Sequence, residues 1–442
     1  MAEIVPFPAF RYNLDRVSLS DVVTQPYDKI TPAMQEHYLQ ASPYNLIAVE
    51  KGPSTPADSP SSNVYTRAEQ ALTAWIRDGI LLRDSSPGIY VYAQEYTVPG
   101  STERRTRQGF IALGRVEDYA AGVVFRHEQT LSGPKVDRLE LLRQTRTQTG
   151  QLFMLYDDPE RRVDTLLAAA ARSVTPAEVR DEYGVRHRLW PVFDPAVTSG
   201  VVRQMALQKL VIADGHHRYE TALAYRDECR AKSGRSDPNA PHEKAMMAFF
   251  NTHGEGLLIL PTHRVVAHLT SFDVDTLCRD VSSTFDAQAY SFSSASARAA
   301  AYSQFRRALA ARGREGRAIG IYERGVFILL TLRPGADLAA QLPGLSPAQR
   351  SLDVVLLHRL LLEKGLGITP AAVSAERNIT YEREMDTAVA EVDDGRAQVC
   401  FLLNPVSVEQ VTQMALAGKV LPQKSTDFYP KLLSGLTLYR LD

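Results

Sequence analysis

The segment "KLVIADGHHRYETALAY", residues 209–225, decides how this chain is expected to fold. The run from Lys209 to Ala213 is apolar enough for a buried strand, whereas a stripe of apolar residues at helical spacing begins at Tyr219. Asp214 to Arg218 are therefore predicted to form the turn between a strand and a helix. A strand followed directly by a helix is typical of an α/β protein.

The predicted turn carries residues that suit the binding of an anion. The start of a helix exposes unpaired backbone N–H groups and the positive end of the helix dipole. Gly215 lets the backbone approach a ligand closely, and His217 and Arg218 add hydrogen-bond donors. Because an arginine can bind a phosphate through two hydrogen bonds, this composition favours a phosphate-bearing ligand.

Asp214 does not fit a simple anion site, because its carboxylate would repel phosphate. A divalent cation or a substrate proton would explain it, since Mg²⁺ is commonly held by one or two carboxylates together with phosphates. The turn therefore predicts phosphoryl chemistry, with Asp214 as a Mg²⁺ ligand. The alternative is structural: Asp214 caps the helix, the two histidines satisfy buried backbone groups, and Arg218 pairs with Glu220 or Glu228.

The overall composition is that of a globular protein with more than one domain. A chain of 442 residues exceeds the usual size of one core, and 44% hydrophobic with 23% charged residues is ordinary for such proteins. The 50 Lys and Arg residues nearly balance 51 Asp and Glu residues, which gives a formal net charge of −1. This balance, and the lack of a helix-turn-helix with a basic recognition helix, argue against a main role in binding nucleic acid or anionic membranes.

Cysteine usage and the first residues predict a cytoplasmic protein. The three cysteines, Cys229, Cys278 and Cys400, are too few and too far apart for a disulfide framework or a Cys-x-x-Cys site. The stretch "MAEIVPFPAFRYN" has prolines where a signal peptide needs an apolar helix, and no apolar run reaches membrane-spanning length. We therefore expect neither export nor membrane anchoring.

Short strand-like runs alternate with longer helical segments in the first half of the chain. The predicted strands are rich in Val, Ile, Tyr and Phe and are bounded by Gly, Pro, Asn or Asp. The predicted helices carry apolar residues at intervals of three and four, and the first ends at Asp78-Gly79. The strands are 21–30, 45–50, 88–98, 107–117, 150–158 and 209–214, the helices are 65–81 and 162–174, and the expected surface loops are 51–63 and 232–244.

The amino-acid composition changes near residue 270. Beyond it, Ala- and Arg-rich helical segments surround a strand pair, "RAIGIYERGVFILLTLRP" (317–334), with Glu323-Arg324-Gly325 as the predicted hairpin turn. The expected fold is therefore mixed α/β in three parts: an N-terminal α/β region, a core with the phosphate turn, and an additional C-terminal α+β domain. Their predicted bounds are 1–120, 121–270 and 271–442.

Common nucleotide and hydrolase motifs are missing from the sequence. It has no Gly-x-x-x-x-Gly-Lys-Ser/Thr loop, no Gly-x-Gly-x-x-Gly and no Gly-x-Ser-x-Gly elbow. "HEQTL" begins at His127 but has Leu131 where a zinc protease needs its second histidine. The chemistry of this chain is therefore expected to depend on a less common motif.

Several segments resemble one known superfamily. "DGHHRY", residues 214–219, resembles the Asp-Gly-x-His-Arg turn of the ParB/sulfiredoxin superfamily, in which a comparable turn binds nucleotide phosphates. "RHEQTLSGPKVDRLELL", residues 126–142, is similar to the His-Glu segment and following helix of the free serine kinases of that superfamily. The chain also resembles a large bacterial and archaeal family loosely called ParB-like, through further segments at 24–30, 42–50, 260–266 and 421–436.

The resemblance implies a ParB/sulfiredoxin-like nucleotide-binding core and the transfer of a phosphoryl group from ATP or ADP, with Mg²⁺, to the hydroxyl of free L-serine or a similar small hydroxyl compound. Such a transfer needs the acceptor oxygen in line, its proton removed and the phosphate charge neutralised. Glu128 is the candidate general base, a role typically worth ~10²–10⁴-fold. Asp214 and His217 complete the expected catalytic set, and the expected phosphate-binding residues are Gly215, His216, His217 and Arg218.

His127, Lys135 and Arg138 are the candidate substrate-binding residues. Lys135 and Arg138 lie three apart on one side of the next helix and could bind the acceptor's carboxylate or the nucleotide. A solvated basic face explains these two equally well, and His127 is as readily structural.

Two further segments are open to two interpretations. Tyr27 and Asp28 either line the pocket or follow a proline that only marks the start of a strand. In "QKSTDFYPK", residues 423–431, the lysines and aromatics either close the site, or Phe428 and Tyr429 anchor a terminal turn.

Two features depart from the compact serine kinases, so the acceptor stays open. The interval from Glu128 to Asp214 is longer here, and the region beyond residue 270 has no counterpart. The alternative function is a ParB-like switch or hydrolase that binds CTP or ATP and has no small-molecule acceptor. A sulfiredoxin-like reductase would need a cysteine at the turn, and none is present. The oligomeric state also stays open, with a homodimer as one option.

Overall fold

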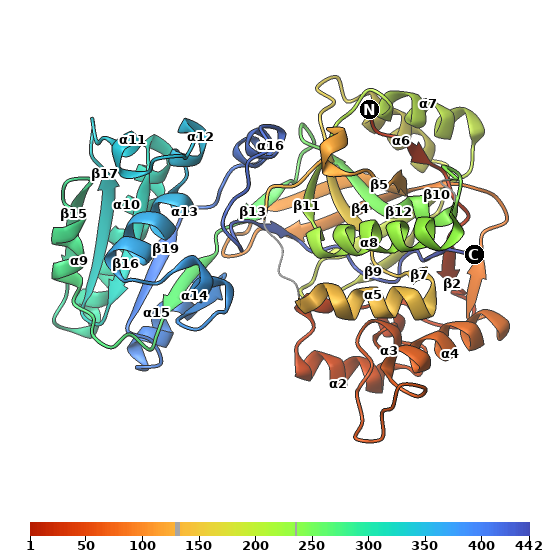
Figure 1. Ribbon diagram of the computed structural model, residues 1–442, viewed down its shortest axis with the longest axis horizontal. Helices are drawn as coiled ribbons and strands as arrows, with labels where there is room; N and C mark the ends of the chain where they lie inside the picture. The colour runs from red at the N-terminus through yellow and green to blue at the C-terminus, as the bar shows by residue number, and fades with distance from the viewer. Residues whose placement is uncertain (129–132, 235–236) are drawn as a thin grey trace. The chain divides into compact units, whose positions relative to one another are not determined.

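The computed structural model describes residues 1–128, 133–234 and 237–442. Its contacts divide the chain into two compact units (Figure 1). Unit 1 comprises Met1–Arg126, Thr130–Leu258 and Pro430–Asp442, and unit 2 comprises His127–Gln129 and Ile259–Tyr429. The chain therefore enters unit 2 twice, and the segment from Pro430 belongs to unit 1 again.

A nine-stranded sheet forms the centre of unit 1. The strands follow one another in the order β6 (Val124–Phe125), β11 (Leu210–Asp214), β8 (Leu152–Tyr156), β12 (Lys244–Asn251), β5 (Arg104–Arg115), β4 (Ile89–Thr97), β10 (Arg186–Val192) and β9 (Ala177–Arg180), and β1 (Ile4–Val5) pairs with β5. β11 runs parallel to β6 and β12 runs parallel to β8, whereas the other neighbours are antiparallel. The sheet is therefore mixed, as expected for a mixed α/β protein.

Helices and short strand pairs surround this sheet. Three helices share its main hydrophobic core: α6 (Arg162–Ala171), α7 (Pro195–Met205) and α8 (His216–Ser233). α5 (Gly133–Thr145) packs on α8, and α4 (Val64–Arg77) packs on α5. The remaining elements are α1 (Leu19–Val22), α2 (Pro32–Ala41), α3 (Ile47–Glu50), the 3-10 turns η1 (Tyr27–Lys29), η2 (Tyr119–Ala121) and η3 (Pro241–Glu243), and the pairs β2 (Phe10–Tyr12) with β3 (Leu81–Arg83) and β7 (Thr147–Gln148) with β21 (Tyr439–Arg440).

Unit 2 contains a six-stranded antiparallel sheet. Its order is β15 (Phe285–Ser291), β17 (Val326–Leu332), β16 (Ala318–Glu323), β19 (Val399–Leu403), β14 (His263–Val266) and β18 (Ile379–Glu382). The other elements are α9 (Val274–Asp280), α10 (Ala295–Glu315), α11 (Leu338–Gln341), α12 (Pro347–Arg350), α13 (Asp353–Leu356), the π-helix η4 (Leu357–Gly365), α14 (Pro370–Ser374), α15 (Met385–Asp393), α16 (Val408–Leu416) and the pair β13 (Leu258–Leu260) with β20 (Asp427–Tyr429).

Both faces of the unit 2 sheet are buried, as the alternation along β16 shows. Ile319 and Ile321 belong to a core shared with α9, α13 and η4. Ala318 and Tyr322 belong to a second core shared with α10 and α15. Because successive strand residues point to opposite faces, one short strand supplies both cores.

Most of the predicted elements are present. The strands predicted at 88–98, 107–117, 150–158 and 209–214 correspond to β4, β5, β8 and β11, and the helices at 65–81 and 162–174 to α4 and α6. α4 ends with Asp78 as its C-cap and Gly79 at φ 70°, as the Asp-Gly pair predicts. The predicted hairpin joins β16 to β17 through Arg324 and Gly325.

Two predicted strands are wrong. Residues 21–30 form the end of α1 and the 3-10 turn η1, and residues 45–50 contain α3. Asn45 precedes the N-cap Leu46 of α3, and its side-chain oxygen accepts a hydrogen bond of 2.9 Å from the backbone N–H of Ile47, a local bond that competes with a strand. Short apolar runs do not distinguish a buried helical turn from a strand by periodicity, which explains both errors.

The compact units differ from the three predicted parts. β4 and β5, from the predicted N-terminal region, pair directly with β10 and β12 of the predicted core. One sheet therefore unites residues on both sides of the predicted division at 120. The second division lies near residue 258 rather than 270, because β14 belongs to the sheet of unit 2.

Gly109 marks the tightest contact between neighbouring strands of the unit 1 sheet. A Cβ at this position would stand 2.1 Å from the carbonyl oxygen of Phe249 and 2.6 Å from Cδ1 of Phe250. We expect Gly109→Ala to destabilise the chain by about 1–3 kcal/mol, because backbone and ring must both move. Thermal unfolding by circular dichroism measures this, with Gly316→Ala as the control, since a Cβ at Gly316 meets nothing within 4 Å. Equal melting temperatures for the two variants would contradict the prediction.

Candidate functional site

The turn after β11 is shorter than predicted. β11 ends at Asp214, Gly215 caps the next helix with φ 91° and ψ 27°, and α8 already begins at His216. His216, His217 and Arg218 thus form the first turn of α8, whose backbone N–H groups lack partners within the helix. The positive φ of Gly215 is unfavourable for a residue with a side chain, so the sequence needs glycine here.

Arg218 folds back over this turn. A Cβ on Gly215 would stand 3.0 Å from Nη2 and 3.1 Å from Nε of Arg218. Nη1 of Arg218 donates a hydrogen bond of 2.6 Å to the carbonyl oxygen of Gln151, and Nη2 lies 3.9 Å from Oδ2 of Asp214. Within the described part of the chain, the N–H groups on Nε and Nη2 make no hydrogen bond. Arg218 therefore keeps donors for a ligand.

Two parts of the structural alternative for this turn do not form. Gly215 caps α8, and no side chain accepts a capping hydrogen bond there. Glu220 pairs with Arg126 at 3.3 Å, and Glu228 pairs with Arg143. Arg218 consequently pairs with neither of the glutamates that the alternative assigned to it.

Asp214 stands among positive groups. Its Oδ2 lies 3.4 Å from Nζ of Lys431, whose side chain is only 10% exposed. Burial alone would raise the pKa of the Asp214 carboxyl, but the charges of Lys431, Arg218, Lys29 and His216 outweigh burial and hold the pKa well below its usual value. The carboxylate is therefore ionised, with several basic side chains acting on it.

This charge balance does not fit a Mg²⁺ ion held by the protein alone. Asp214 offers one carboxylate, and that carboxylate already has Lys431 and Arg218 as its counter-ions. In residues 1–128, 133–234 and 237–442, no group of three His, Cys, Asp or Glu side chains is arranged to hold a metal ion. The expected role of Asp214 as a metal ligand thus lacks support from its surroundings.

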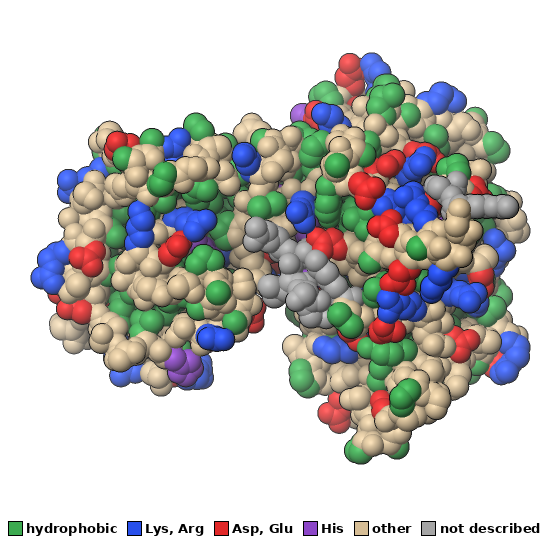
Figure 2. All heavy atoms as spheres, in the orientation of Figure 1, with side chains coloured by type: hydrophobic (Ala, Val, Ile, Leu, Met, Phe, Trp, Pro, Cys, Tyr) green, Lys and Arg blue, Asp and Glu red, His purple; other side chains and the backbone are tan. Residues whose placement is uncertain are grey.

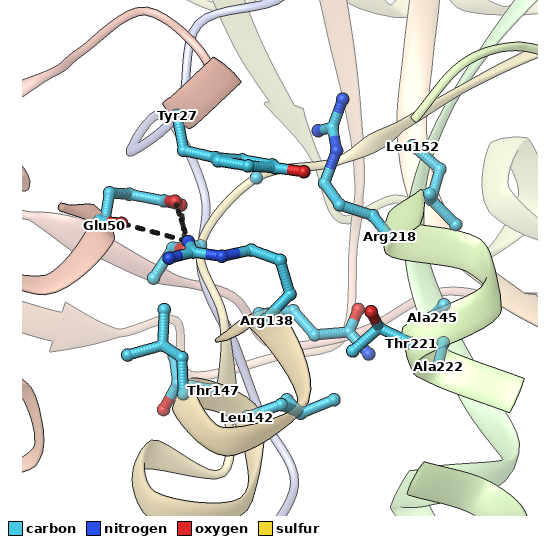
Figure 3. A pocket seen from close by; sticks show the side chains of 14 residues that line it. Tyr27, Glu50, Arg138, Leu142, Thr147, Leu152, Arg218, Thr221, Ala222 and Ala245 are labelled. Atoms are coloured by element: carbon cyan, nitrogen blue, oxygen red, sulfur yellow. Dashed lines mark hydrogen bonds and ion pairs between the residues drawn. The ribbon is translucent and has the colours of Figure 1, made fainter. Parts of the chain in front are cut away.

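A pocket of about 70 Å³ lies beside the turn (Figure 3). Its walls come from segments far apart in the sequence, and α8 contributes Arg218 to it. The lining residues are Tyr27, Glu50, Arg138, Leu141, Leu142, Thr147, Gln148, Thr149, Gly150, Leu152, Arg218, Thr221, Ala222 and Ala245. Figure 3 shows the hydroxyl of Tyr27 directed toward Arg218, and the guanidinium of Arg138 joined to Glu50 below the tyrosine ring.

Glu50 and Arg138 form a buried ion pair in the pocket wall. Nη1 of Arg138 donates to Oε2 of Glu50 at 3.2 Å and to its carbonyl oxygen at 3.0 Å, and both side chains are about nine-tenths buried. The hydroxyl of Thr149 donates to Oε1 of Glu50. The guanidinium lies 4.4 Å from the ring centre of Tyr27. Burial, then the charge of Asp28, raises the pKa of Tyr27 to about 12, so its phenol is neutral at physiological pH.

Gly150 brings the backbone close to three polar groups at the edge of this pocket. A Cβ there would stand 2.9 Å from Oγ of Ser434, 3.3 Å from Nη1 of Arg218 and 3.7 Å from Oε1 of Glu50, so a larger residue would displace one of them. A hydroxyl, a guanidinium and a carboxylate thus converge on this part of the wall, and such groups can bind a ligand that carries both an anionic and a cationic group.

His127 and Glu128 belong to unit 2. His127 is fully buried, and its Nε2 lies 2.8 Å from Oγ1 of Thr426, which favours the structural interpretation of this residue. Oε1 of Glu128 accepts a hydrogen bond of 2.6 Å from the backbone N–H of Lys424. Arg264 supports the same loop, because its Nη2 donates to the carbonyl oxygen of Lys424 at 3.0 Å. The carboxylate of Glu128 is therefore held in a defined orientation.

Four segments that the sequence singled out contribute to unit 1. Tyr27 and Arg138 line the pocket with Arg218, and Lys431 from the segment 423–431 pairs with Asp214. Asp28 acts on Tyr27 only through its charge. Phe428 and Tyr429, in contrast, belong to β20 and are buried in unit 2. The side chain of Lys135 lies outside the described residues.

Two of the groups at this site were not predicted from the sequence. Glu50 was placed at the end of a predicted strand, with no functional role, although it stands in the resembling segment 42–50. The segment from Thr147 to Gly150 was also not identified. A glutamate at the end of the apolar run 45–50 was the available signal, since charged residues are rarely buried unless they are paired.

The surface agrees with the near-zero net charge. On the face of unit 1 seen in Figure 2, acidic and basic side chains are interspersed. Of the helices that the structure describes, none is both long and apolar enough to cross a membrane.

A model of one protein family matches residues 4–355. The chain belongs to the DUF1015 family. The description of DUF1015 is a protein of unknown function, so membership assigns no reaction. Among curated proteins, none matches the sequence.

This DUF1015 chain is similar to three solved structures, each at low identity and low TM-score. A conserved hypothetical protein from Pyrococcus furiosus shares 12% identity at a TM-score of 0.34, over 72% of this chain and 92% of that one. A free serine kinase in complex with AMP shares 12% identity at a TM-score of 0.33, over 71% and 89%. SbnI with a C-terminal truncation, from Staphylococcus aureus, shares 9% identity at 0.34, over 73% and 85%. Similarity at this level assigns neither a ParB-like core nor a reaction.

We expect the turn to bind inorganic pyrophosphate without a divalent cation, because Lys431, Arg218 and Lys29 already surround it with positive charge. Titration calorimetry in excess EDTA measures this. Arg218→Met should weaken the binding at least tenfold, since a hydrogen bond to a charged group contributes about 1.5–3 kcal/mol. Lys232→Met, on the exposed end of α8, is the control. Binding that vanishes with EDTA would show that the protein's own cations are insufficient.

Proposed function

We propose that this DUF1015 chain transfers a phosphoryl group from ATP or ADP to the hydroxyl of free L-serine or a similar small hydroxyl compound. One observation carries the proposal: the first turn of α8, with basic side chains around it, adjoins a small pocket that contains a buried ion pair. The first feature suits phosphates, and the second suits a small polar acceptor. The resemblance of residues 126–142 and 214–219 to free serine kinases points to the same reaction.

The phosphates are assigned to the start of α8. Backbone N–H groups of His216 and His217 and the unused donors of Arg218 would bind them, and Gly215 lets them approach the backbone. These groups are fixed before the ligand arrives, which is the condition under which electrostatic stabilisation of a transition state is most effective. These roles do not depend on any Mg²⁺ that binds together with the nucleotide.

The pocket size favours the acceptor over the nucleoside as its occupant. A volume of about 70 Å³ holds roughly five to seven water-sized groups, which approaches the size of an amino acid such as serine but not of a nucleoside. Glu50 offers a carboxylate for the ammonium group of an amino acid, and the arginines offer donors for its carboxylate. Arg138 keeps Glu50 compensated in the buried wall, as a buried charge requires.

Glu128 is assigned as the general base on the resemblance. In the proposed step, the acceptor hydroxyl oxygen forms a bond to the terminal phosphorus of the nucleotide while the bond to the bridging oxygen breaks. The hydroxyl proton passes to the carboxylate of Glu128, and AMP or ADP leaves. The hydrogen bond from Lys424 orients this carboxylate, which is what a base needs to act on one particular oxygen.

The direct test is incubation of the purified chain with γ-labelled ATP or β-labelled ADP and L-serine. We expect labelled O-phosphoserine, and Glu128→Gln should lower its rate of formation ~10²–10⁴-fold, the usual contribution of a general base. Nucleotide affinity, measured by calorimetry, should stay unchanged in this variant. Glu140→Gln, on an exposed part of α5, is the matched control. Nucleotide binding or hydrolysis without phosphoserine would favour the switch and contradict the kinase.

Glu50 provides a second test. Glu50→Gln keeps the shape of the side chain but removes its charge, so we expect a higher KM for L-serine with an unchanged KM for the nucleotide. The effect should be at least tenfold, because a charge-assisted hydrogen bond to an ammonium group contributes about 1.5–3 kcal/mol. Circular dichroism checks that the variant folds despite the loss of the Arg138 pair. Equal effects on both KM values would indicate a general structural role for Glu50.

A further inference from the structure

The backbone of residues 430–434 is fixed inside unit 1 on both sides of Lys431. Arg107 donates to the carbonyl oxygen of Pro430, and Nε2 of Gln94 donates to that of Lys431 at 2.7 Å. Nε2 of Gln151 donates to the carbonyl oxygen of Leu433 at 3.1 Å. These donors come from the central strands β4 and β5 and from Gln151 at the start of β8. Hydrogen bonds to the sheet therefore fix the backbone position of Lys431.

Arg107 is an unusual donor for this purpose, because it is completely buried. Its guanidinium lies 4.6 Å from the ring centre of Phe153 and 5.0 Å from that of Phe250, and its Nε and Nη2 also donate to Gln94. Burial lowers the pKa of Arg107 to about 10, so the group is still charged at neutral pH. A buried cation is costly unless its donors are hydrogen-bonded. The hydrogen bonds of Arg107 to Gln94 and to the carbonyl oxygen of Pro430 join β4 and β5 to the segment that carries Lys431.

The side chain of Lys431 ends beside the start of α8. Its Nζ lies 3.4 Å from Oδ2 of Asp214, the residue directly before the Gly215 cap. Lysine is rarely this buried, and here the carboxylate beside it also lies near Arg218. Two basic side chains thus lie beside one carboxylate at the positive end of a helix, where the helix dipole favours an anion.

We propose that Lys431 is a phosphate-binding residue of this site, and that Asp214 is the positioning residue that holds its ammonium group at the start of α8. The inference rests on the proposed function, since it assigns the phosphate to the same turn. Lysine acts here as a compact point charge that compensates the transferred phosphoryl group. Gln94 and Arg107 position the backbone from which it extends.

The experiment compares the full chain with Lys431→Met, Lys431→Arg and Lys232→Met. Calorimetry with inorganic pyrophosphate in excess EDTA gives the dissociation constants, and thermal unfolding checks the fold. We expect Lys431→Met to bind at least tenfold more weakly and to transfer phosphate about 10²–10³-fold more slowly, as when one preorganised donor is removed. Lys431→Arg should recover part of the affinity, and Lys232→Met should match the unchanged chain.

The outcomes separate this inference from the proposed function. If the unchanged chain forms no O-phosphoserine, the proposed function fails, and the role of Lys431 in the transfer fails with it. If the unchanged chain forms O-phosphoserine but binds no pyrophosphate in EDTA, only the inference is overturned. If the unchanged chain and Lys431→Met bind pyrophosphate equally, only the inference is overturned. If Lys431→Arg is as weak as Lys431→Met although both fold, the charge of residue 431 is not what binds the anion, and the inference is overturned as well.

Discussion

The carboxylate of Asp214 among its cations is the interaction on which the rest of the site depends. It ends β11, precedes the glycine that starts α8, and has Lys431 and Arg218 as counter-ions. Without this negative charge, two basic side chains would repel one another beside the positive end of a helix. With it, the two side chains can lie close together at the start of α8.

In the pocket beside the turn, a buried carboxylate is again compensated by an arginine. Glu50 is buried because Arg138 compensates it, and Arg138 in turn stacks on Tyr27. Each of these residues comes from a different part of the chain, so the pocket exists only when α3, α5 and the η1 turn have all packed. A small acceptor would then replace its hydrogen bonds to water by hydrogen bonds to groups that are already in place. Such preorganisation lowers the entropic cost of binding the acceptor.

Local sequence patterns predicted much of the fold and part of the site. The strand-to-helix turn was predictable because an apolar run, a glycine and a new periodicity occur within a few residues. Arg218 was identified as a binding residue because it follows that turn, and Arg138 because it lies three residues from Lys135 on one side of a predicted helix. Glu50 and the ion pair of Lys431 with Asp214 were not predictable, since they join segments 88 and 217 residues apart. No local pattern records such distances, and the short apolar run at 45–50 was mistaken for a strand.

The return of residues 430–442 to unit 1 bears on how this protein is made. The sheet strands and α8 are synthesised long before Lys431, so during synthesis Asp214 is at first without this counter-ion. A chain that stops before residue 430 would also lack the partner of β7. The arrangement therefore makes the proposed site depend on residues 430–442: products truncated before residue 430 would keep most of the sheet but lack the lysine that pairs with Asp214.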